Sequence, residues 1–327
     1  MTSHPPANME ANPHAGVHSQ RYAGPMKTDV APNGAPPKSP AIRPLRAGEE
    51  AEATTVFQEA VLGSWRQPKP PLWVSDDDRH AEHRLATSDL QRMHAENADL
   101  VLVAERDGEM VGMAATTIRD DHAHIVFLFV LPEHQGKGVG KALLAETTRA
   151  IAAHGAHKIS LTASDDRRAW QRYLRMGLLP GAPIVSLSAP EPQIPDAAAD
   201  GLTQTAVDPA DERQLAALDA LDHQIKGASR RVDRLAWHAE GAREALVYSE
   251  DGADTPVGAY VVSRHHDQCR IGPVVAIAPE HVAPIVRRAL VAARDLCRGG
   301  AGAVAGGRPG AEPGRCRSAA GGGVSAA

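Results

Sequence analysis

The amino-acid sequence predicts a mixed α/β (α+β) protein with two domains, and three observations lead to this prediction. The chain has 327 residues, which exceeds the usual size of one domain, about 100 to 200 residues. Residues 98–132 contain three successive strand-like segments, and apolar residues at helical spacing follow over 138–154. A segment near residue 280 repeats part of this arrangement.

The elements expected in the first domain follow one another along the sequence. Residues 41–61 show a strand followed by an amphipathic helix, and Asp107-Gly108 and Asp120-Asp121 are turn signals between the three strands of residues 98–132. The helix over 138–154 places five residues on one face: Val139, Leu143, Leu144, Thr147 and Ile151. We expect a further strand in "KISLTAS" (158–164) and a helix in "DDRRAWQRYLRMG" (165–177).

Composition divides the chain into five parts. Residues 1–40 are rich in proline, which predicts a disordered leader, and residues 189–201 read as a Pro/Ala/Asp-rich linker. The first domain then covers 41–188 and the second covers 202–299. Residues 300–327 lack a periodic apolar pattern although the repeat predicts a strand and a helix there. We therefore expect a disordered or frameshifted tail.

Charge and cysteine content narrow the class of partner and the compartment. Lys and Arg number 35 against 40 Asp and Glu. The chain therefore lacks the excess of positive charge that binding to nucleic acid or to an anionic membrane favours. The three cysteines, Cys269, Cys297 and Cys316, are widely spaced and indicate neither a disulfide framework nor a metal cluster. With no signal-like start and no apolar run of about 20 residues, we expect a cytoplasmic protein outside the membrane.

The repeat contains one turn in each half of the chain, and only the turn in the first half is rich in glycine. "FVLPEHQGKGVGKALLAE" (129–146) can be laid over "VAIAPEHVAPIVRRALVAA" (275–293), so that Pro132-Glu133-His134 meets Pro279-Glu280-His281. The glycines of the first copy meet other residues in the second: Gly136, Gly138 and Gly140 against Ala283, Ile285 and Arg287. We therefore expect one glycine-turn site per chain.

A glycine-rich turn that opens a helix suits a phosphate, because unpaired backbone N–H groups gather there at the positive end of the helix dipole. The spacing excludes a P-loop, since three residues separate Gly136 from Gly140 and Ala142 follows Lys141. A dinucleotide fingerprint starting at Gly136 would need glycine or alanine where Lys141 stands. The remaining pattern is Gln135-x-x-Gly138-x-Gly140.

This pattern resembles the pyrophosphate motif of the GNAT superfamily of acyl-CoA-dependent N-acetyltransferases. A second match is "AWQRYLRMG", where Ala169, Tyr173 and Gly177 stand four residues apart as in the family's later helix. The resemblance covers residues 41–188 and implies a twisted, mostly antiparallel sheet flanked by helices. Leu178 departs from the family, which usually has an aromatic residue there. Residues 202–299 look like the smaller, degenerate GNAT-like domain of two-domain members.

The resemblance also implies a reaction and a site. Acetyl-CoA would be the cosubstrate, and its acetyl group would pass to a primary amine by direct attack in a ternary complex. The pyrophosphate would bind amides of Gln135, Gly136, Lys137, Gly138, Val139, Gly140 and Lys141, and the pantetheine arm would lie along a strand that includes Leu128 and Val130. Tyr173 would protonate the departing CoA thiolate. For the base, His124 is favoured over His122, Glu133 and His134.

Several alternatives stay open. Tyr173 could simply pack on its helix face, and His124 could be an ordinary exposed or packed histidine. "HHDQC" (265–269) and the histidines of the leader are expected to bind no metal. Asp76, Asp77 and Asp78 read as a helix start, and as an acidic patch they would favour a cationic acceptor. The acceptor is a small-molecule or peptide amine, the protein a monomer or homodimer, and the alternative function a non-catalytic acyl-CoA sensor.

Overall fold

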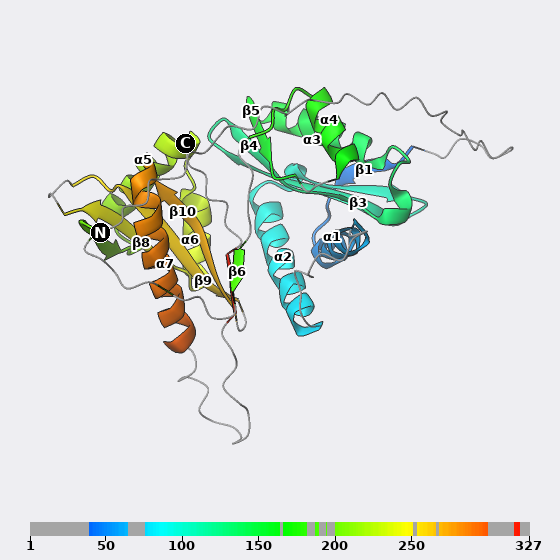
Figure 1. The fold of residues 1–327 in the computed structure, drawn as a ribbon. Coiled ribbons are helices and arrows are strands. Elements are labelled where there is room, and N and C mark those ends of the chain that lie inside the picture. The colour runs from blue at the N-terminus through cyan, green and yellow to red at the C-terminus, as the bar shows by residue number, and fades with distance from the viewer. Residues whose placement is uncertain are drawn as a thin grey trace, which may run out of the picture. The chain divides into compact units, whose positions relative to one another are not determined.

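The computed structural model describes residues 39–64, 76–163, 166–181, 187–189, 194, 200–250, 254–265, 268–299 and 317–320. The predicted leader, except its last two residues, lies outside them, as do most of the predicted linker and tail. Residues 38–327 form one compact unit, in which the described strands make two sheets of five and six strands (Figure 1). The predicted division into two domains therefore stays a prediction.

The first sheet has the order β1-β2-β3-β4-β5. Its strands are β1 (Ala41–Pro44), β2 (Val101–Arg106), β3 (Glu109–Arg119), β4 (His122–Val130) and β5 (Lys158–Leu161). Neighbouring strands are antiparallel except β4 and β5, which are parallel. Four helices accompany this sheet: α1 (Glu50–Ser64), α2 (Asp76–Glu96), α3 (Val139–Ala153) and α4 (Arg167–Arg175). The predicted α+β class and mostly antiparallel sheet are confirmed.

Local sequence signals explain these elements. Asp107 and Gly108 both adopt positive φ between β2 and β3, at 54° and 86°, as a two-residue hairpin turn requires. The five residues predicted for the apolar face of α3 are its buried residues. Asp166 caps α4 by accepting a hydrogen bond from the N–H of Arg168 at 2.9 Å, which stabilises the first turn of that helix.

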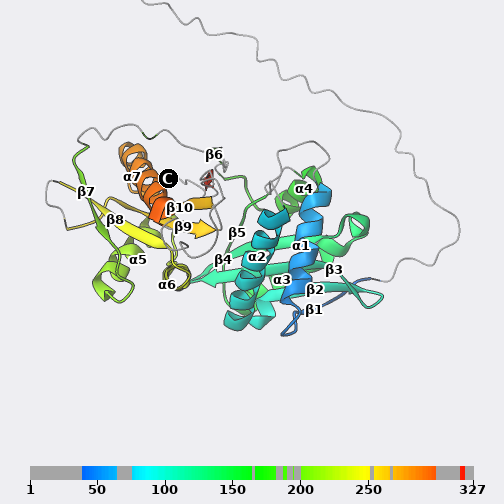
Figure 2. The ribbon, with the colours of Figure 1, turned by 90° about the horizontal axis from the view of Figure 1, so that it is seen from below.

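The two faces of the first sheet are covered by different helices. Phe57 of α1 and Leu90 of α2 pack with Phe127 on one face, and Figure 2 shows α1 and α2 side by side across the strands. Leu144 and Ile151 of α3 pack with Ile125 on the other face. The sheet is therefore buried on both sides.

A bulge in β4 opens a gap beside β5. The register of β4 with β3 shifts so that Ile125 faces Thr116 and Phe127 faces Ala115, which leaves Val126 as an extra residue. The last pair between β4 and β5 is Ile125 with Leu161. Because a bulge bends a strand and increases its twist, β4 and β5 stop pairing at the bulge.

The second sheet has the order β6-β11-β10-β9-β8-β7. Its strands are β6 (Leu187–Ala189), β7 (Leu202–Ala206), β8 (Arg243–Ser249), β9 (Gly258–His265), β10 (Gln268–Ala276) and β11 (Arg317–Ala320), and its helices are α5 (Glu212–Lys226), α6 (Arg231–Ala239) and α7 (Pro279–Gly299). β10 and β11 are parallel. The hairpin expected around "HHDQC" is present, since β9 ends at His265 and β10 begins at Gln268.

Three expectations need correction. Residues 187 and 188 do not belong with the first sheet, because β6 pairs with β11 in the second. Part of the tail is a strand, since Arg317–Ala320 pairs with β10. Backbone groups at a sheet edge can pair with a segment that has no apolar periodicity. Cys269 and Cys297 form a disulfide with Cα atoms 6.5 Å apart, because the fold brings together cysteines that are 28 positions apart.

No helix among the described residues has the length and apolar character to cross a membrane. No group of three or more His, Cys, Asp or Glu side chains in the described part of the chain is arranged to hold a metal ion.

Candidate functional site

The glycine turn lies between β4 and α3, directly after a short 3-10 helix, η2 (Pro132–His134). Gly136 and Gly138 have φ of 77° and 87°, a left-handed conformation that side chains with a β-carbon rarely adopt. A β-carbon at either position would meet no atom within 4 Å. Both glycines therefore border open space, where a ligand can approach the backbone closely.

The unpaired N–H groups of this turn cover a shorter range than predicted. Among the described residues, the N–H groups of residues 136–140 have no hydrogen-bond acceptor. Those of Gln135 and Lys141 are already bonded, to the carbonyls of Pro132 at 3.2 Å and Gly138 at 3.1 Å. Five N–H groups at the start of α3 remain for an anion, where the helix dipole also favours negative charge.

Gln135 braces the turn instead of facing a ligand with its side chain. Its Nε2 donates to the carbonyl of Val130 at 3.0 Å, and its Oε1 accepts from Nη2 of Arg168 at 2.8 Å. The carbonyl of Val130 is therefore engaged within the protein. The predicted contacts of Leu128 and Val130 with a pantetheine arm stay a prediction.

Two arginines of α4, which the sequence analysis missed, lie beside the turn. Arg168 contacts Gln135, and Nη1 of Arg172 would be 2.9 Å from a β-carbon at Gly140. Arg168 and Arg172 are four residues apart, so they share one face of the helix. With the exposed Lys137 and Lys141 they place cationic side chains around the five unpaired N–H groups. The spacing of these two arginines in "RRAWQR" is the sequence feature from which their shared helix face could have been predicted.

Tyr173 lies on the α3 face of the sheet, near the gap between β4 and β5. Its side chain packs against the cluster that contains Ile125, Leu144 and Leu161. Burial raises the pKa of the Tyr173 phenol, and the charge of Arg172 opposes this effect. Tyr173 is therefore protonated at neutral pH, as a proton donor must be.

His124 lies on the opposite face of the same sheet. Ala123 and Ile125 belong to the α3 cluster, and because side chains alternate along a strand, His124 points to the side of α1 and α2. Its Nδ1 is 2.9 Å from the hydroxyl of Ser160 on β5. Burial and Lys226 lower the pKa of His124. The neutral imidazole, which can accept a proton, is thus favoured.

Glu133 and His134, two other candidate bases, have environments that favour a base less than that of His124. Glu133 is exposed in η2. Nδ1 of His134 is buried without a hydrogen-bond partner in the described structure, and so is Nδ1 of His281, the residue aligned with it in the second half. The shared environment of these two histidines indicates a role in the turn.

Part of the chain is similar to known acetyltransferases. A family model for the acetyltransferase (GNAT) family matches residues 60–178. An acetyltransferase from Photorhabdus laumondii is 35% identical over 81 residues, which is 25% of this chain and 57% of that protein. An acetyltransferase from Pectobacterium atrosepticum is 32% identical over 81 residues, with the same two shares. The chain spans about half the length of these curated relatives.

Solved structures are similar over a larger part of the chain. A candidate acetyltransferase from Pyrococcus horikoshii has a TM-score of 0.54 at 19% identity, over 81% of each chain. A GCN5-related N-acetyltransferase from Sphaerobacter thermophilus has a TM-score of 0.53 at 14% identity, over 87% of each chain. These likenesses concern the fold alone, whereas the family match covers the glycine turn, His124 and Tyr173. Residues 60–178 of this chain therefore resemble the acetyltransferase (GNAT) family.

Proposed function

We propose that the protein transfers an acetyl group from acetyl-CoA to a primary amine, by direct attack in a ternary complex. The observation that carries this proposal is the row of five unpaired N–H groups at the start of α3, beside the gap where β4 and β5 stop pairing. The turn suits a pyrophosphate, and β4 beyond Ile125 has an edge that β5 does not pair, where an extended arm can lie. We expect a small-molecule or peptide acceptor, a cytoplasmic setting, and a monomer or homodimer.

The reaction requires two proton transfers. The amine nitrogen attacks the thioester carbonyl carbon, and the C–S bond then breaks to release the CoA thiolate. At pH 7 an amine of pKa about 10.4 is unprotonated in only about one molecule in 2,500, so a base must take its proton. His124 takes that role, because the lowered pKa keeps its imidazole neutral.

Tyr173 is the proton donor for the thiolate. Its phenol is protonated at neutral pH because burial raises its pKa. A thiol has a pKa near 8.5, so proton transfer from this phenol is uphill. Tyr173 therefore contributes by hydrogen bonding and orientation as well as by acidity. His124 and Tyr173 lie on opposite faces of the sheet.

Calorimetric titration with acetyl-CoA tests the binding half of this proposal. Gly138→Asp places a carboxylate beside the unpaired N–H groups, and we expect it to abolish binding. The matched control is Gly155→Asp at the other end of α3, where φ is 73° and a β-carbon also meets nothing within 4 Å. This control carries the same backbone strain and charge, so it should bind like the wild type. Equal loss in both variants, or no binding by the folded wild type, would overturn the proposal.

Thiol release tests the catalytic half and separates an enzyme from an acyl-CoA sensor. We expect amine-dependent release of CoA thiol that falls by about 10- to 100-fold in Tyr173→Phe. Acetyl-CoA binding should change little in that variant. A sensor would bind acetyl-CoA and release no thiol with any amine in a broad panel.

A further inference from the structure

Ser160 lies between two histidines at the start of the β4–β5 pair. Its hydroxyl oxygen is 2.7 Å from Nε2 of His122 and 2.9 Å from Nδ1 of His124. The parallel register sets His124 beside Ser160 and His122 beside Lys158. Strand alternation places both histidines on one face, so the three side chains form a continuous hydrogen-bonded row.

The chemistry of a hydroxyl fixes how this row can be bonded. A serine has one O–H donor and two acceptor lone pairs. If it donates to one histidine nitrogen, the other histidine must donate to it through an N–H. One ring nitrogen facing Ser160 is therefore protonated, and the other is not.

We propose that Ser160 relays the proton taken up by His124 to His122, so that His124, Ser160 and His122 form a proton chain across β4 and β5. This inference rests on the proposed function, because it assigns an exit route to the proton of the acceptor amine. His122 and Ser160 are positioning and relay residues, whereas His124 is the base of the proposed reaction.

The proton movement balances atom by atom. At the start, Nδ1–H of His124 donates to Ser160, and the Ser160 O–H donates to Nε2 of His122. The amine gives its proton to Nε2 of His124, for which no described residue is a hydrogen-bond partner. The Nδ1 proton of His124 then passes to the Ser160 oxygen, and the Ser160 proton passes to Nε2 of His122. The result is a neutral His124 and a His122 imidazolium.

Charged groups and exposed surface surround the His122 end of the row. His122 is affected by Asp121, Lys158 and Lys226, and Asp121 raises its pKa against the combined lowering by burial and the two lysines. Lys158 and Asp121 form an exposed ion pair at the turn before β4, with a contact of 3.0 Å. The start of β4 is therefore close to water, which can receive the proton from His122.

The surroundings of His124 differ. Burial, Lys226 and His122 lower its pKa, and Asp233 raises it. Asp233 is itself held by two bonds to Arg119, at 2.7 and 3.0 Å. A charged His124 is therefore disfavoured, and passing the proton onward returns the base to its neutral form.

Kinetics test the chain through three variants. The assay uses acetyl-CoA and the first amine among spermidine, lysine, glucosamine and phenethylamine that supports thiol release. Ser160→Ala removes the hydroxyl and His122→Gln removes the terminal acceptor, and we expect each to lower kcat by about 10- to 100-fold with an unchanged KM for acetyl-CoA. Ser160→Thr keeps the hydroxyl and should restore kcat to within a few-fold of wild type. If Ser160→Ala is slow but His122→Gln is normal, Ser160 only orients His124, and the relay is overturned.

A pH profile separates the relay from a structural effect. Wild-type kcat should rise with pH through a single limb below the ordinary histidine pKa, because both pKa values are lowered. In His122→Gln, the pH at which kcat rises should shift, because the site that finally holds the proton has been removed. An unshifted limb would count against the chain.

Nitrogen-15 NMR of the histidines in the full chain needs no acceptor. We expect both His122 and His124 to carry the proton on Nδ1 at neutral pH, and Ser160→Ala to uncouple their titrations. A proton on Nε2 of His122 with an unprotonated Nδ1 on His124 would overturn the relay. Predicted tautomers without wild-type turnover would mean that the proposed function fails, whereas turnover with the opposite tautomers would mean that only the relay fails.

Discussion

The two sheets share a backbone plan and differ in where they place charge. In the first half the N–H of Leu131 bonds to the carbonyl of Val111 at 3.0 Å, and in the second half Ile277 bonds to Val257 at 2.9 Å. The donor and the acceptor are separated by the same number of residues in both pairs. A bulge interrupts β4 at Val126 and β10 between Ile271 and Val274. The repeat seen in the sequence is thus also present in the hydrogen bonding.

Corresponding glycines make the same close contacts. A β-carbon at Gly112 would be 3.0 Å from Cδ1 of Leu143 on α3, and one at Gly258 would be 2.4 Å from Cδ1 of Ile285 on α7. Gly112 lets α3 approach β3, and Gly258 lets α7 approach β9. Glycine is kept in both halves because packing requires it there.

The turn that precedes α3 and the start of α7 differ in what stands at their aligned positions. Gly138 borders open space, whereas the aligned Ile285 is fully buried in the core of the second sheet. A side chain at this position fills the core, while its absence exposes backbone N–H groups.

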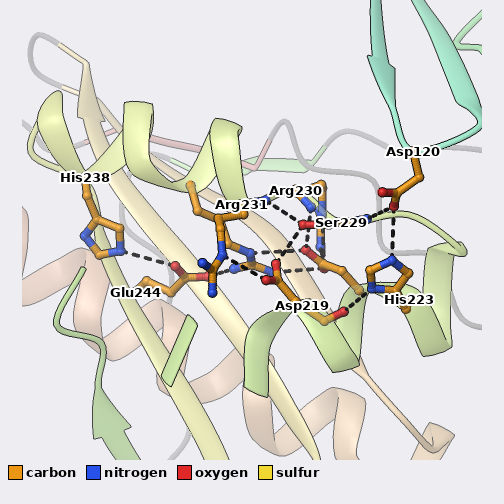
Figure 3. A network of polar contacts seen from close by, with 10 residues as sticks. Asp120, Asp219, His223, Ser229, Arg230, Arg231, His238 and Glu244 are labelled. Carbon is orange, nitrogen blue, oxygen red and sulfur yellow. Dashed lines mark hydrogen bonds and ion pairs between the residues drawn. The ribbon is translucent and has the colours of Figure 1, made fainter. Parts of the chain in front are cut away.

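A network of polar contacts runs through α5, α6 and β8 of the second half and includes Asp120 of the first half (Figure 3). Arg234 of α6 is 1% exposed and donates to Asp222 of α5 at 2.9 and 3.2 Å. It also forms an ion pair with Glu244 of β8, which His238 contacts at 3.2 Å. Two helices and a strand are thereby tied together by a single guanidinium.

Removing Arg234 should have the largest effect. Arg234→Leu leaves two buried carboxylates without their common partner, and we expect a loss of about 3 to 5 kcal/mol in the free energy of unfolding. Urea denaturation measures it. The control is Arg213→Leu on α5, which is exposed and should cost little. A loss below about 1 kcal/mol would show that the buried network contributes little to the free energy of unfolding.

Arg172 provides the corresponding test in the first half. Arg172→Gln should weaken acetyl-CoA binding about tenfold, or about 1.4 kcal/mol, because a guanidinium beside Gly140 is lost. Arg175→Gln, on the same helix and exposed, is the control. Acetyl-pantetheine lacks the phosphates, so its binding should be the same in wild type and Arg172→Gln. A similar loss with both donors would mean that Arg172 acts only on the fold.

Most of the first sheet could be predicted because its signals are local. Hairpin turns such as Asp107-Gly108, the apolar face of α3 and the capping residue Asp166 each depend on a few neighbouring residues. The glycine turn was found for the same reason. Its unpaired N–H range was predicted too wide, since the bonds of Gln135 and Lys141 depend on the shape of the turn.

The rest depends on contacts between residues far apart in sequence. Ser160 meets His124 only through the register of two parallel strands, and nothing in "KISL" indicates it. The Cys269–Cys297 disulfide links a strand to a helix, and β11 was missed because backbone pairing at an edge needs no apolar pattern. Such features follow from tertiary structure and not from local pattern.

The smallest expected effect concerns an ion pair at the partly exposed start of α1. Arg43 donates to Glu49 at 2.7 and 2.9 Å and lowers the pKa of Glu49 to about 2 from an ordinary value of 4.5. A lowered carboxyl pKa stabilises the fold above its ordinary value, and this stability is lost as pH falls through about 2. Since water screens the pair, Glu49→Gln should cost only about 1 kcal/mol at pH 7.

Urea denaturation from pH 7 down to pH 2 checks this prediction. The difference between wild type and Glu49→Gln should shrink steadily below the ordinary glutamate pKa. Glu52→Gln, at an exposed position in the first turn of α1, should show almost no difference at any pH. The deficit of Arg234→Leu should persist over the upper part of this range, because Asp222 also has a lowered pKa and both carboxylates stay buried. If the Glu49 and Arg234 variants lost stability equally at pH 7, burial would not be what distinguishes the two halves.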